Sequence, residues 1–313
     1  MRKALGLWSN FRKRRNRVAL IEASRKGKSE KVKQLLSRGT EVSAADERGF
    51  TALMVASEKG HLGVVKILLS NGASSEEETD SGISALSLAI SNGHAEVVKA
   101  LFSSGADVNV NIEKRIAALM AASSYGHNDV IKLLLDNCAD ANAASGAGVT
   151  SLMLASNAGH QESAKLLLES GAHVNATTSS GNSALKAAAK EGHSGVVALL
   201  LERGADINAK DGTGKAPLIW ASYGGHADVV RVLIEQGADV NVIDDSNSAT
   251  AGNTPLHFAC LKDHLEVVKL LLDNGASVNA MNCADYTPLS LASSQEVRGI
   301  LKKHGGKAIS FSL

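Results

Sequence analysis

Aromatic residues and proline are both scarce in this chain. Only 3% of its 313 residues are aromatic, and only three are proline. A β-sandwich needs strands rich in β-branched and aromatic residues, separated by many turns, so this class of fold is disfavoured. Hydrophobic residues still make up 44% of the chain, which is enough to form a core. The composition therefore favours an all-α fold in which small side chains let helices pack closely.

Cysteine is also scarce, and long hydrophobic runs are missing. Cys138, Cys260 and Cys283 are odd in number and form no C-x-x-C pair, so we expect neither a disulfide framework nor a thiolate zinc site. No apolar run approaches the roughly 20 residues of a membrane-spanning helix. The basic first residues lack the apolar segment of a secretory signal. We therefore expect a cytoplasmic protein, with the nucleus as an alternative.

The chain has almost no net charge, but its charges are unevenly distributed. The overall formal charge is +1, which is not that of a protein that binds nucleic acid over its whole surface. Residues 1–17 contain seven basic residues and no acidic one, so this segment carries +7 and the rest −6. We treat residues 1–17 as a basic arm. We expect the remaining body not to contact nucleic acid, because its charge repels phosphates.

A repeat of 33 residues runs through nearly the whole chain. The segment from Thr51 to Met54 has counterparts at this interval, and a single longer step of 38 residues precedes Thr254. Nine units result. We place them in an array over residues 18–304, followed by a tail over residues 305–313. The units start near residues 13, 46, 79, 112, 145, 178, 211, 244 and 282.

Each unit has the pattern of two short helices. The first helix is expected to start at a polar residue whose hydroxyl caps it, such as Thr254 or Thr287, and all three prolines occupy the following position. It ends at a Gly-His pair such as Gly60-His61. A second helix follows with one apolar stripe, and it stops at a glycine suited to the left-handed conformation. One such pair cannot bury its stripe alone, so neighbouring pairs must stack.

These motifs resemble the ankyrin repeat. The segment Thr254–His257 matches the signature of that family in full, and Gly204–Asn208 matches its finger motif. The resemblance implies an all-α ankyrin-repeat solenoid of stacked antiparallel helix pairs with β-hairpin-like fingers. In some members finger asparagines accept hydroxylation, although we expect them first to hydrogen-bond the finger. The matching residues are Asn109, Asn142, Asn175, Asn208, Asn241 and Asn279.

No set of residues in the sequence supports catalysis. Seven histidines recur in one slot of successive units, and a helix spacing of about 10 Å keeps any two from sharing a metal ion. We expect hydrogen bonds between helices from them instead. The segment Gly212–Lys215 lacks the other residues of a phosphate-binding loop. The nine repeats leave no room in this sequence for a catalytic domain, so we predict no enzymatic activity, no cofactor and no metal.

The resemblance implies that one or more partner proteins bind to the concave face, which first helices and finger tips form. Exposed aromatic residues favour binding hot spots. Trp220 has two open interpretations, as a contact residue or as a side chain that fills the slot between helices. We expect the protein itself to be a monomer. The candidate partner-binding residues are Phe50, Glu58, Lys59, Ser91, Asn92, Tyr125, Asn157, Lys190, Glu191, Lys215, Trp220, Tyr223, Lys262 and Tyr286.

The basic arm has four interpretations. Leu7, Trp8 and Phe11 are spaced for one face of a short helix, and a basic run follows them. The arm can cover the end of the first unit, act as a nuclear import signal, lie on an anionic membrane or serve as a mitochondrial presequence. An alternative function is therefore a targeting or regulatory subunit that localises an enzyme or client through residues 1–17. We expect membrane contact nowhere else.

Two units depart from the regular pattern. In the fourth unit, Arg115 replaces a finger glycine, Ala117 a capping residue and Cys138 the glycine after the second helix. A lost cap and a left-handed non-glycine residue each cost about 1 kcal/mol, so we predict a soft region over residues 111–142. A five-residue insertion within Asp244–Asn253 enlarges one finger. It is either a binding element or a tolerated loop.

Overall fold

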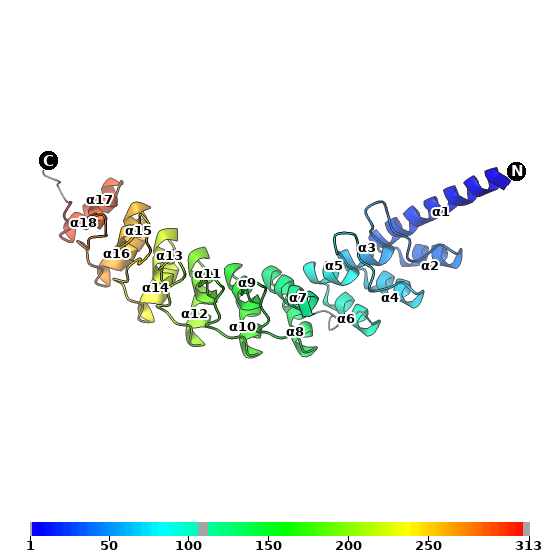
Figure 1. Cartoon of the computed structure of the whole chain (residues 1–313), viewed down its shortest axis with the longest axis horizontal. Coiled ribbons are helices and arrows are strands. Elements are labelled where there is room, and N and C mark those ends of the chain that lie inside the picture. Colours follow the sequence, from blue (N-terminus) through cyan, green and yellow to red (C-terminus); the bar gives the residue numbers. More distant parts are fainter. Residues whose placement is uncertain (1, 106–111, 309–313) are drawn as a thin grey trace. The chain divides into compact units, whose positions relative to one another are not determined.

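The protein is built almost entirely of helices. The computed structural model describes the backbone of residues 2–105 and 112–308 and the side chains of residues 13–105 and 116–308. Within these ranges there are 18 helices, and the β-structure consists of isolated bridges in the fingers. The helices form nine antiparallel pairs (Figure 1), so the predicted all-α fold of stacked helix pairs is confirmed.

Backbone contacts divide the chain into two units, and each is described by itself. The N-terminal unit covers residues 1–139 and contains four helix pairs. In each pair the second helix packs on the first, and first helices also pack on first helices. The eight helices are α1 (Arg2–Arg25), α2 (Ser29–Ser37), α3 (Ala52–Glu58), α4 (Leu62–Ser70), α5 (Ala85–Ser91), α6 (Ala95–Ser103), α7 (Ile112–Tyr125) and α8 (Asn128–Asp136).

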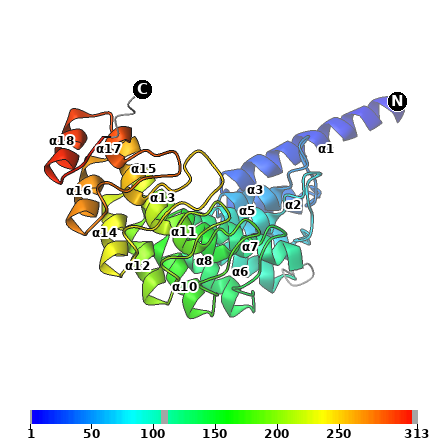
Figure 2. The ribbon, with the colours of Figure 1, turned by 60° about the vertical axis from the view of Figure 1, so that its left-hand side comes forward.

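The C-terminal unit covers residues 140–313 and contains five helix pairs. Its first helices form one row and its second helices another (Figure 1), and the loops between pairs extend beside the first helices (Figure 2). The ten helices are α9 (Ser151–Asn157), α10 (Gln161–Glu169), α11 (Ala184–Glu191), α12 (Ser194–Glu202), α13 (Pro217–Gly224), α14 (Ala227–Glu235), α15 (Pro255–Leu261), α16 (Leu265–Asp273), α17 (Pro288–Leu291) and α18 (Gln295–Lys303).

Side-chain caps start most of the first helices. The Oγ1 atom of Thr51 accepts a hydrogen bond from the N–H of Met54 at 3.3 Å at the start of α3. The expectation that Thr287 caps its helix was wrong. Its hydroxyl donates to the carbonyl oxygen of Lys307 at 2.8 Å, because the segment after α18 returns to the start of α17. In the last pair, this hydroxyl therefore anchors the following segment.

Helix α7 is longer than the repeat predicts. It starts at Ile112, five residues before the expected cap at Ala117. Residues 112–118 include good helix formers and contain no glycine, serine or threonine, so nothing in this segment stops the helix. Cys138 does adopt the left-handed conformation that its slot predicts, with φ of 64°. The N-terminal unit ends directly after it, at Ala139.

The basic arm continues into the first helix pair. Helix α1 runs without a break through 24 residues, so residues 2–17 and the first helix of the array are one element. Its C-terminal part is anchored, because Leu20, Ile21 and Ala23 are buried and α1 packs on α2 and α3. The basic residues that precede Leu20 are therefore attached to the folded unit through a continuous helix.

Within each of the two units, histidines join several helix pairs to the pair before them. The Nε2 atom of His94 donates to the carbonyl oxygen of Glu58 at 3.0 Å. The imidazole lies so close to Gly60 that a Cβ atom there would be 2.7 Å from the ring. The hydrogen bonds expected between helices are thus confirmed. Equivalent bonds of 2.8–3.0 Å are made by His61, His127, His193, His226 and His264.

Finger asparagines form a second set of bonds between repeats. The Oδ1 atom of Asn175 accepts from the N–H of Asp206 at 2.9 Å, while its Nδ2 donates to the carbonyl oxygen of Gly204 at 3.0 Å. The expectation that these asparagines hydrogen-bond the fingers is confirmed at the described positions, and Asn109 lies outside them. The same two bonds are made by Asn142, Asn241 and Asn279.

Candidate protein-binding surface

In the N-terminal unit, most of the predicted polar binding residues already have partners within the unit. The side chains of Glu58 and Lys59 form an ion pair at 2.8 Å. The Nδ2 atom of Asn92 donates to the carbonyl oxygen of Leu88, also at 2.8 Å. These groups would exchange an internal partner for an external one on binding. Two further predicted residues, Phe50 and Ser91, are half-buried.

Tyr125 is the most exposed aromatic side chain that the structure describes. It lies at the end of α7, and 60% of its surface is accessible. Its ring stacks on the imidazole of His127 with centroids 5.8 Å apart. Tyr125 therefore combines exposure with support from a neighbouring ring.

In the C-terminal unit, three aromatic rings form a cluster on α13 and α15. Trp220 meets Tyr223 edge-on with centroids 6.3 Å apart, and Tyr223 meets Phe258 in the same way at 5.9 Å. Phe258 is buried, Trp220 is half-buried, and Tyr223 is 40% exposed. Trp220 contacts Tyr223 on its own helix and Lys186 on α11, and both of its interpretations stay open. It also supports the exposed ring of Tyr223.

The indole of Trp220 is fixed by a buried carboxylate in the preceding finger. One oxygen of Asp211 accepts from the Nε1 of Trp220 at 2.9 Å and pairs with the ammonium of Lys186 at 3.1 Å. Its other oxygen accepts from the N–H and hydroxyl of Thr213 and from the N–H of Lys215. Burial alone would raise the pKa of Asp211, but these hydrogen bonds outweigh it and hold the pKa below its ordinary value.

A second buried ion pair lies in the next finger. The ammonium of Lys215 is 3.0 Å from Asp244, and the two side chains are 12% and 0% exposed. Lys215 was a candidate for partner contact, but this pairing makes it chiefly an internal link. Asp244 also accepts from Ser246 and Thr250. Although burial raises the pKa of Asp244, these bonds lower it below its ordinary value.

The five-residue insertion is closed around the same aspartate. The N–H of Asp244 donates to the carbonyl oxygen of Asn253 at 2.9 Å, and the N–H of Gly252 donates back to Asp244 at 2.7 Å. Asn253 is only 2% exposed, and it accepts a hydrogen bond from Asn282 in the next finger. The enlarged finger therefore has a well-bonded base.

Lysine ammonium groups lie over two rings of the aromatic cluster. The Nζ of Lys186 is 4.8 Å from the Trp220 ring centroid, and that of Lys262 is 4.7 Å from the Tyr223 centroid. Such placements favour a fixed ring through cation–π attraction. The cluster thus joins apolar surface with positive charge. The sequence did not single out Lys186, since its role depends on an ion pair with a finger that follows it.

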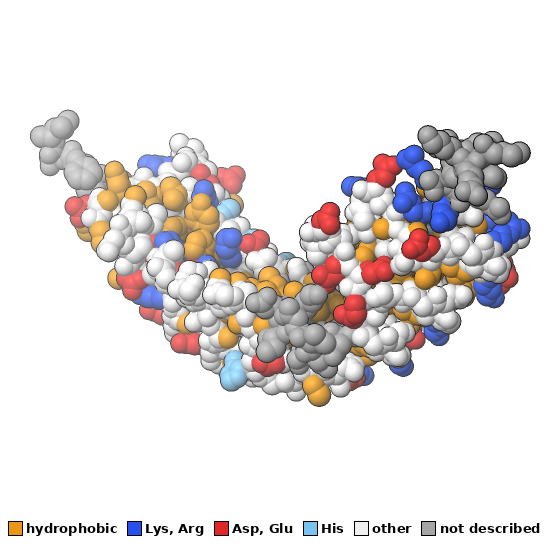
Figure 3. All heavy atoms as spheres, turned by 45° about the vertical axis from the view of Figure 1, so that its right-hand side comes forward, with side chains coloured by type: hydrophobic (Ala, Val, Ile, Leu, Met, Phe, Trp, Pro, Cys, Tyr) orange, Lys and Arg blue, Asp and Glu red, His pale blue; other side chains and the backbone are white. Residues whose placement is uncertain are grey.

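Further apolar side chains are exposed on the same unit. Tyr286 is 43% exposed and Leu261 is 40% exposed, while the finger residues Ile243 and Met281 are 49% and 56% exposed. Figure 3 shows hydrophobic side chains gathered beside lysines on this unit. The sequence could have pointed to Ile243 and Met281. Both occupy the finger position that holds Lys210 in an earlier repeat, so an exposed side chain is expected there.

The remaining predicted residues of this unit are exposed. Lys190 and Glu191 neutralise each other at 3.2 Å. Asn157 is exposed, and its carbonyl oxygen accepts the hydrogen bond of His193.

Other chemically interesting groups do not converge on a site. Burial and the charge of Asp263 raise the pKa of the Cys260 thiol to about 12, which makes it a poor nucleophile. Within the described part of the chain, no three metal-ligating side chains lie together. None of the described helices has the length and apolar character needed to cross a bilayer.

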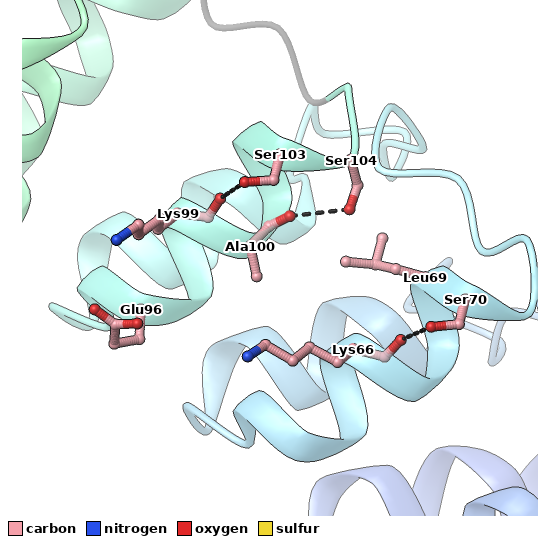
Figure 4. Close-up of a pocket in the computed structure, with 8 residues that line it drawn as sticks. All are labelled: Lys66, Leu69, Ser70, Glu96, Lys99, Ala100, Ser103 and Ser104. Carbon is pink, nitrogen blue, oxygen red and sulfur yellow. Dashed lines mark hydrogen bonds between the residues drawn. The ribbon is translucent and has the colours of Figure 1, made fainter.

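A groove lies between α4 and α6 in the N-terminal unit. It has a volume of about 630 Å³, and its lining includes Lys66, Lys99 and Glu96. Its serine hydroxyls donate to carbonyl oxygens of their own helices or helix ends (Figure 4), so they are not directed at a ligand. The groove therefore lacks the convergent polar groups of a small-molecule site.

Comparison with protein-family models agrees with this architecture. A model of ankyrin repeats in three copies matches residues 20–112, 109–178 and 175–244. A second model, of ankyrin repeats in many copies, matches residues 218–272 and 256–301. No curated protein sequence matches the chain. The family matches cover nearly all of the helix pairs, and the chain belongs to the ankyrin-repeat family.

Proposed function

We propose that this protein is a non-catalytic scaffold or adaptor that binds a partner protein around Tyr223. Ankyrin repeats generally mediate protein–protein interactions and typically lack catalysis. The observation that carries the proposal is the ring of Tyr223, which is exposed yet contacted by Trp220, Phe258 and Lys262.

A side chain that is already fixed has a small entropic cost on binding. Immobilising a mobile side chain costs about 0.5–1.5 kcal/mol, and the ring of Tyr223 is held before the partner arrives. Its support is itself rigid, because Trp220 is bonded to the buried Asp211. Exposed aromatic residues on such a support are favoured as hot spots.

The surroundings of Tyr223 suit a partner segment with apolar side chains. Leu261, on the neighbouring helix α15, occupies the corresponding position of the next unit and is also 40% exposed. Lys262 follows it and offers a positive charge over the Tyr223 ring. We therefore propose a partner that presents apolar groups together with at least one acidic group.

The test compares variants of the two exposed tyrosines with a surface control. A partner captured by the full chain is purified, and its affinity is measured by calorimetry. Tyr223→Ala is expected to weaken binding by roughly 30-fold, which corresponds to a hot spot of about 2 kcal/mol. Tyr125→Ala measures the contribution of the N-terminal unit, and combining both substitutions gives the largest loss. The control Arg231→Ala, exposed on α14, leaves the affinity unchanged.

Thermal unfolding separates contact from stability in this experiment. Because Tyr223 is 40% exposed but also packs on Trp220 and Phe258, its truncation is expected to lower the melting temperature only slightly, and affinities are therefore compared well below the unfolding transition. A partner that binds wild type and the double variant with equal affinity would refute the proposed surface.

A second candidate function is targeting through the N-terminal helix. It is favoured by the concentration of basic residues on α1, which is anchored in the first helix pair. Removing residues 1–17 would cut α1 in the middle, so substitutions on its exposed face are a cleaner test than truncation. A targeting subunit would lose its location on such substitution while it retained partner binding at Tyr223.

A further inference from the structure

Positive charge is concentrated at one end of the N-terminal unit. Residues 1–40 contain thirteen arginines and lysines but only two acidic residues, a formal charge of +11, whereas the whole chain has +1. Figure 3 shows Lys and Arg side chains gathered at this end of the unit. The remaining 273 residues therefore carry −10. Such a separation of charge favours contact with an anionic surface at the basic end.

The basic residues of α1 belong to a projecting helix with an apolar stripe. Lys13, Arg14 and Arg15 are exposed, and Val18 is 57% exposed although it is apolar. In the sequence, Val18 follows Phe11 at an interval of seven residues, which is the spacing of one helix face. The N-terminal half of α1 extends beyond the other helices of its unit (Figure 2). An apolar stripe bordered by arginine and lysine is typical of helices that lie on a bilayer surface.

A cleft beside this helix is lined by three basic side chains and one acidic side chain, and two donors near it have no acceptor. It lies between α1 and the first finger, has a volume of about 730 Å³ and is lined by Lys13, Arg17 and Thr40 among others. The Nε of Arg17 and the hydroxyl of Thr40 are buried and have no hydrogen-bond partner within the described residues. An oxyanion in this cleft would supply acceptors for both groups.

Two acidic side chains lie near the cleft: Glu41, which lines it and is exposed, and Glu47, which is weakly held. Arg14 pairs with Glu47 at 2.9 Å, but the two side chains are 69% and 80% exposed. Ion pairs of this exposure contribute little and are screened by salt. Arg14 can therefore exchange Glu47 for a phosphate at small cost.

We infer that α1 docks on a membrane surface that contains anionic phospholipid. Its apolar stripe, including Val18, enters the headgroup region, the basic residues beside it contact lipid phosphates, and the cleft accepts a headgroup. A nucleic acid would engage the same charges, but it would leave the exposed side chain of Val18 without a partner. This inference goes beyond the proposed binding at Tyr223, which belongs to the other unit, so either can fail without the other.

The test measures sedimentation of the full chain with vesicles. One vesicle contains phosphatidylcholine alone, and the other includes about 30% phosphatidylserine. Binding is expected only to the second, and it is expected to weaken as salt increases. The variant with Lys13→Gln, Arg14→Gln and Arg15→Gln is expected to bind roughly 100-fold more weakly, since each basic residue contributes about fivefold.

An apolar variant and a charge-matched control make the result specific. The variant with Phe11→Ser and Val18→Ser keeps all charges and is expected to lose at least about tenfold in affinity. The control with Lys132→Gln, Lys165→Gln and Lys269→Gln removes the same charge from exposed positions of second helices. It is expected to stay within about twofold of wild type, because these charges are not on α1.

Three outcomes would overturn the inference. The first is no preference for the anionic vesicles at low salt. The second is an equal loss in the charge-matched control, which would indicate nonspecific attraction. The third is an unaltered affinity of the apolar variant together with tighter binding to a DNA duplex than to vesicles, which would assign the surface to nucleic acid.

Discussion

The buried carboxylate of Asp211 is expected to be the main polar anchor of the C-terminal unit. The substitution Asp211→Ala removes the acceptor of four hydrogen bonds and of one ion pair. It leaves the Trp220 N–H without its partner and the Lys186 ammonium without its carboxylate, although that ammonium still donates to Asn182. Each buried donor left unpaired costs about 1–3 kcal/mol. Lys186 is only 14% exposed, so water replaces little of what it loses. We expect a loss of about 4 kcal/mol in the free energy of unfolding.

Two further variants separate the effect of the Asp211 charge from that of its side-chain shape and from that of losing any acidic residue. Asp211→Asn retains one acceptor oxygen for the finger but turns an amide NH₂ toward two donors, so we expect about half of the alanine loss. Asp245→Ala is the matched control. This acid also pairs with a lysine, Lys210, but it is 52% exposed, and we expect its loss to cost less than about 0.5 kcal/mol.

Fluorescence can follow this unit selectively. The chain has two tryptophans, Trp8 in α1 and Trp220 in the C-terminal unit, so urea unfolding in a Trp8→Phe background reports on Trp220 alone. The free energy of unfolding obtained in this way belongs to the C-terminal unit alone, because a long repeat array need not unfold in one step. If Asp211→Ala and Asp245→Ala shift the transition by the same amount, Asp211 is not an anchor.

Two other predictions concern acid pH and local stability. His257 is buried, its Nδ1 accepts from the N–H of Thr254 and its Nε2 donates to the carbonyl oxygen of Tyr286, so burial lowers its pKa below the ordinary 6.5. Below pH 6.5 the unfolded chain then binds a proton that the folded chain does not, so the free energy of unfolding should decrease as the pH is lowered. Urea titrations at several pH values should show a weaker dependence of this free energy on pH in His257→Gln than in wild type. An equal dependence on pH in the two proteins would contradict this assignment. Amide hydrogen exchange should be faster over residues 111–142 than over residues 183–240, and equal protection in the two segments would remove the predicted soft region.

Much of the fold follows from local chemistry in the sequence. The interval of 33 residues, the capping hydroxyls and the glycines with positive φ act within a few residues of one another, so each can be identified from sequence alone. The close approach of His94 to Gly60 shows why the Gly-His pair recurs, since any side chain at Gly60 would meet the imidazole. These constraints are satisfied independently in each repeat, and this explains why the number of helix pairs was predicted correctly.

The details of the candidate surface depended on contacts that the repeat does not encode. Lys186 and Asp211 lie in successive units, and their pairing depends on the reach of a lysine across the gap. The early start of α7 reflects the absence of any stop signal before Ala117, while the pattern of the other units suggested a loop there. Exposed residues such as Tyr223 could be assigned from their slot, but the rings and charges that fix them could not.

The histidine bonds also reveal how this chain tolerates a longer loop. Five of them span 36 residues, whereas His264 reaches the carbonyl oxygen of Tyr223 across 41 residues, and the difference equals the inserted segment. The extra residues are therefore absorbed before α15, and the spacing of the helices continues as if they were absent. The length of this finger can therefore change without changing how α15 stacks on α13. A foreign peptide could accordingly be grafted between Ser246 and Thr250 while the helices keep their stacking.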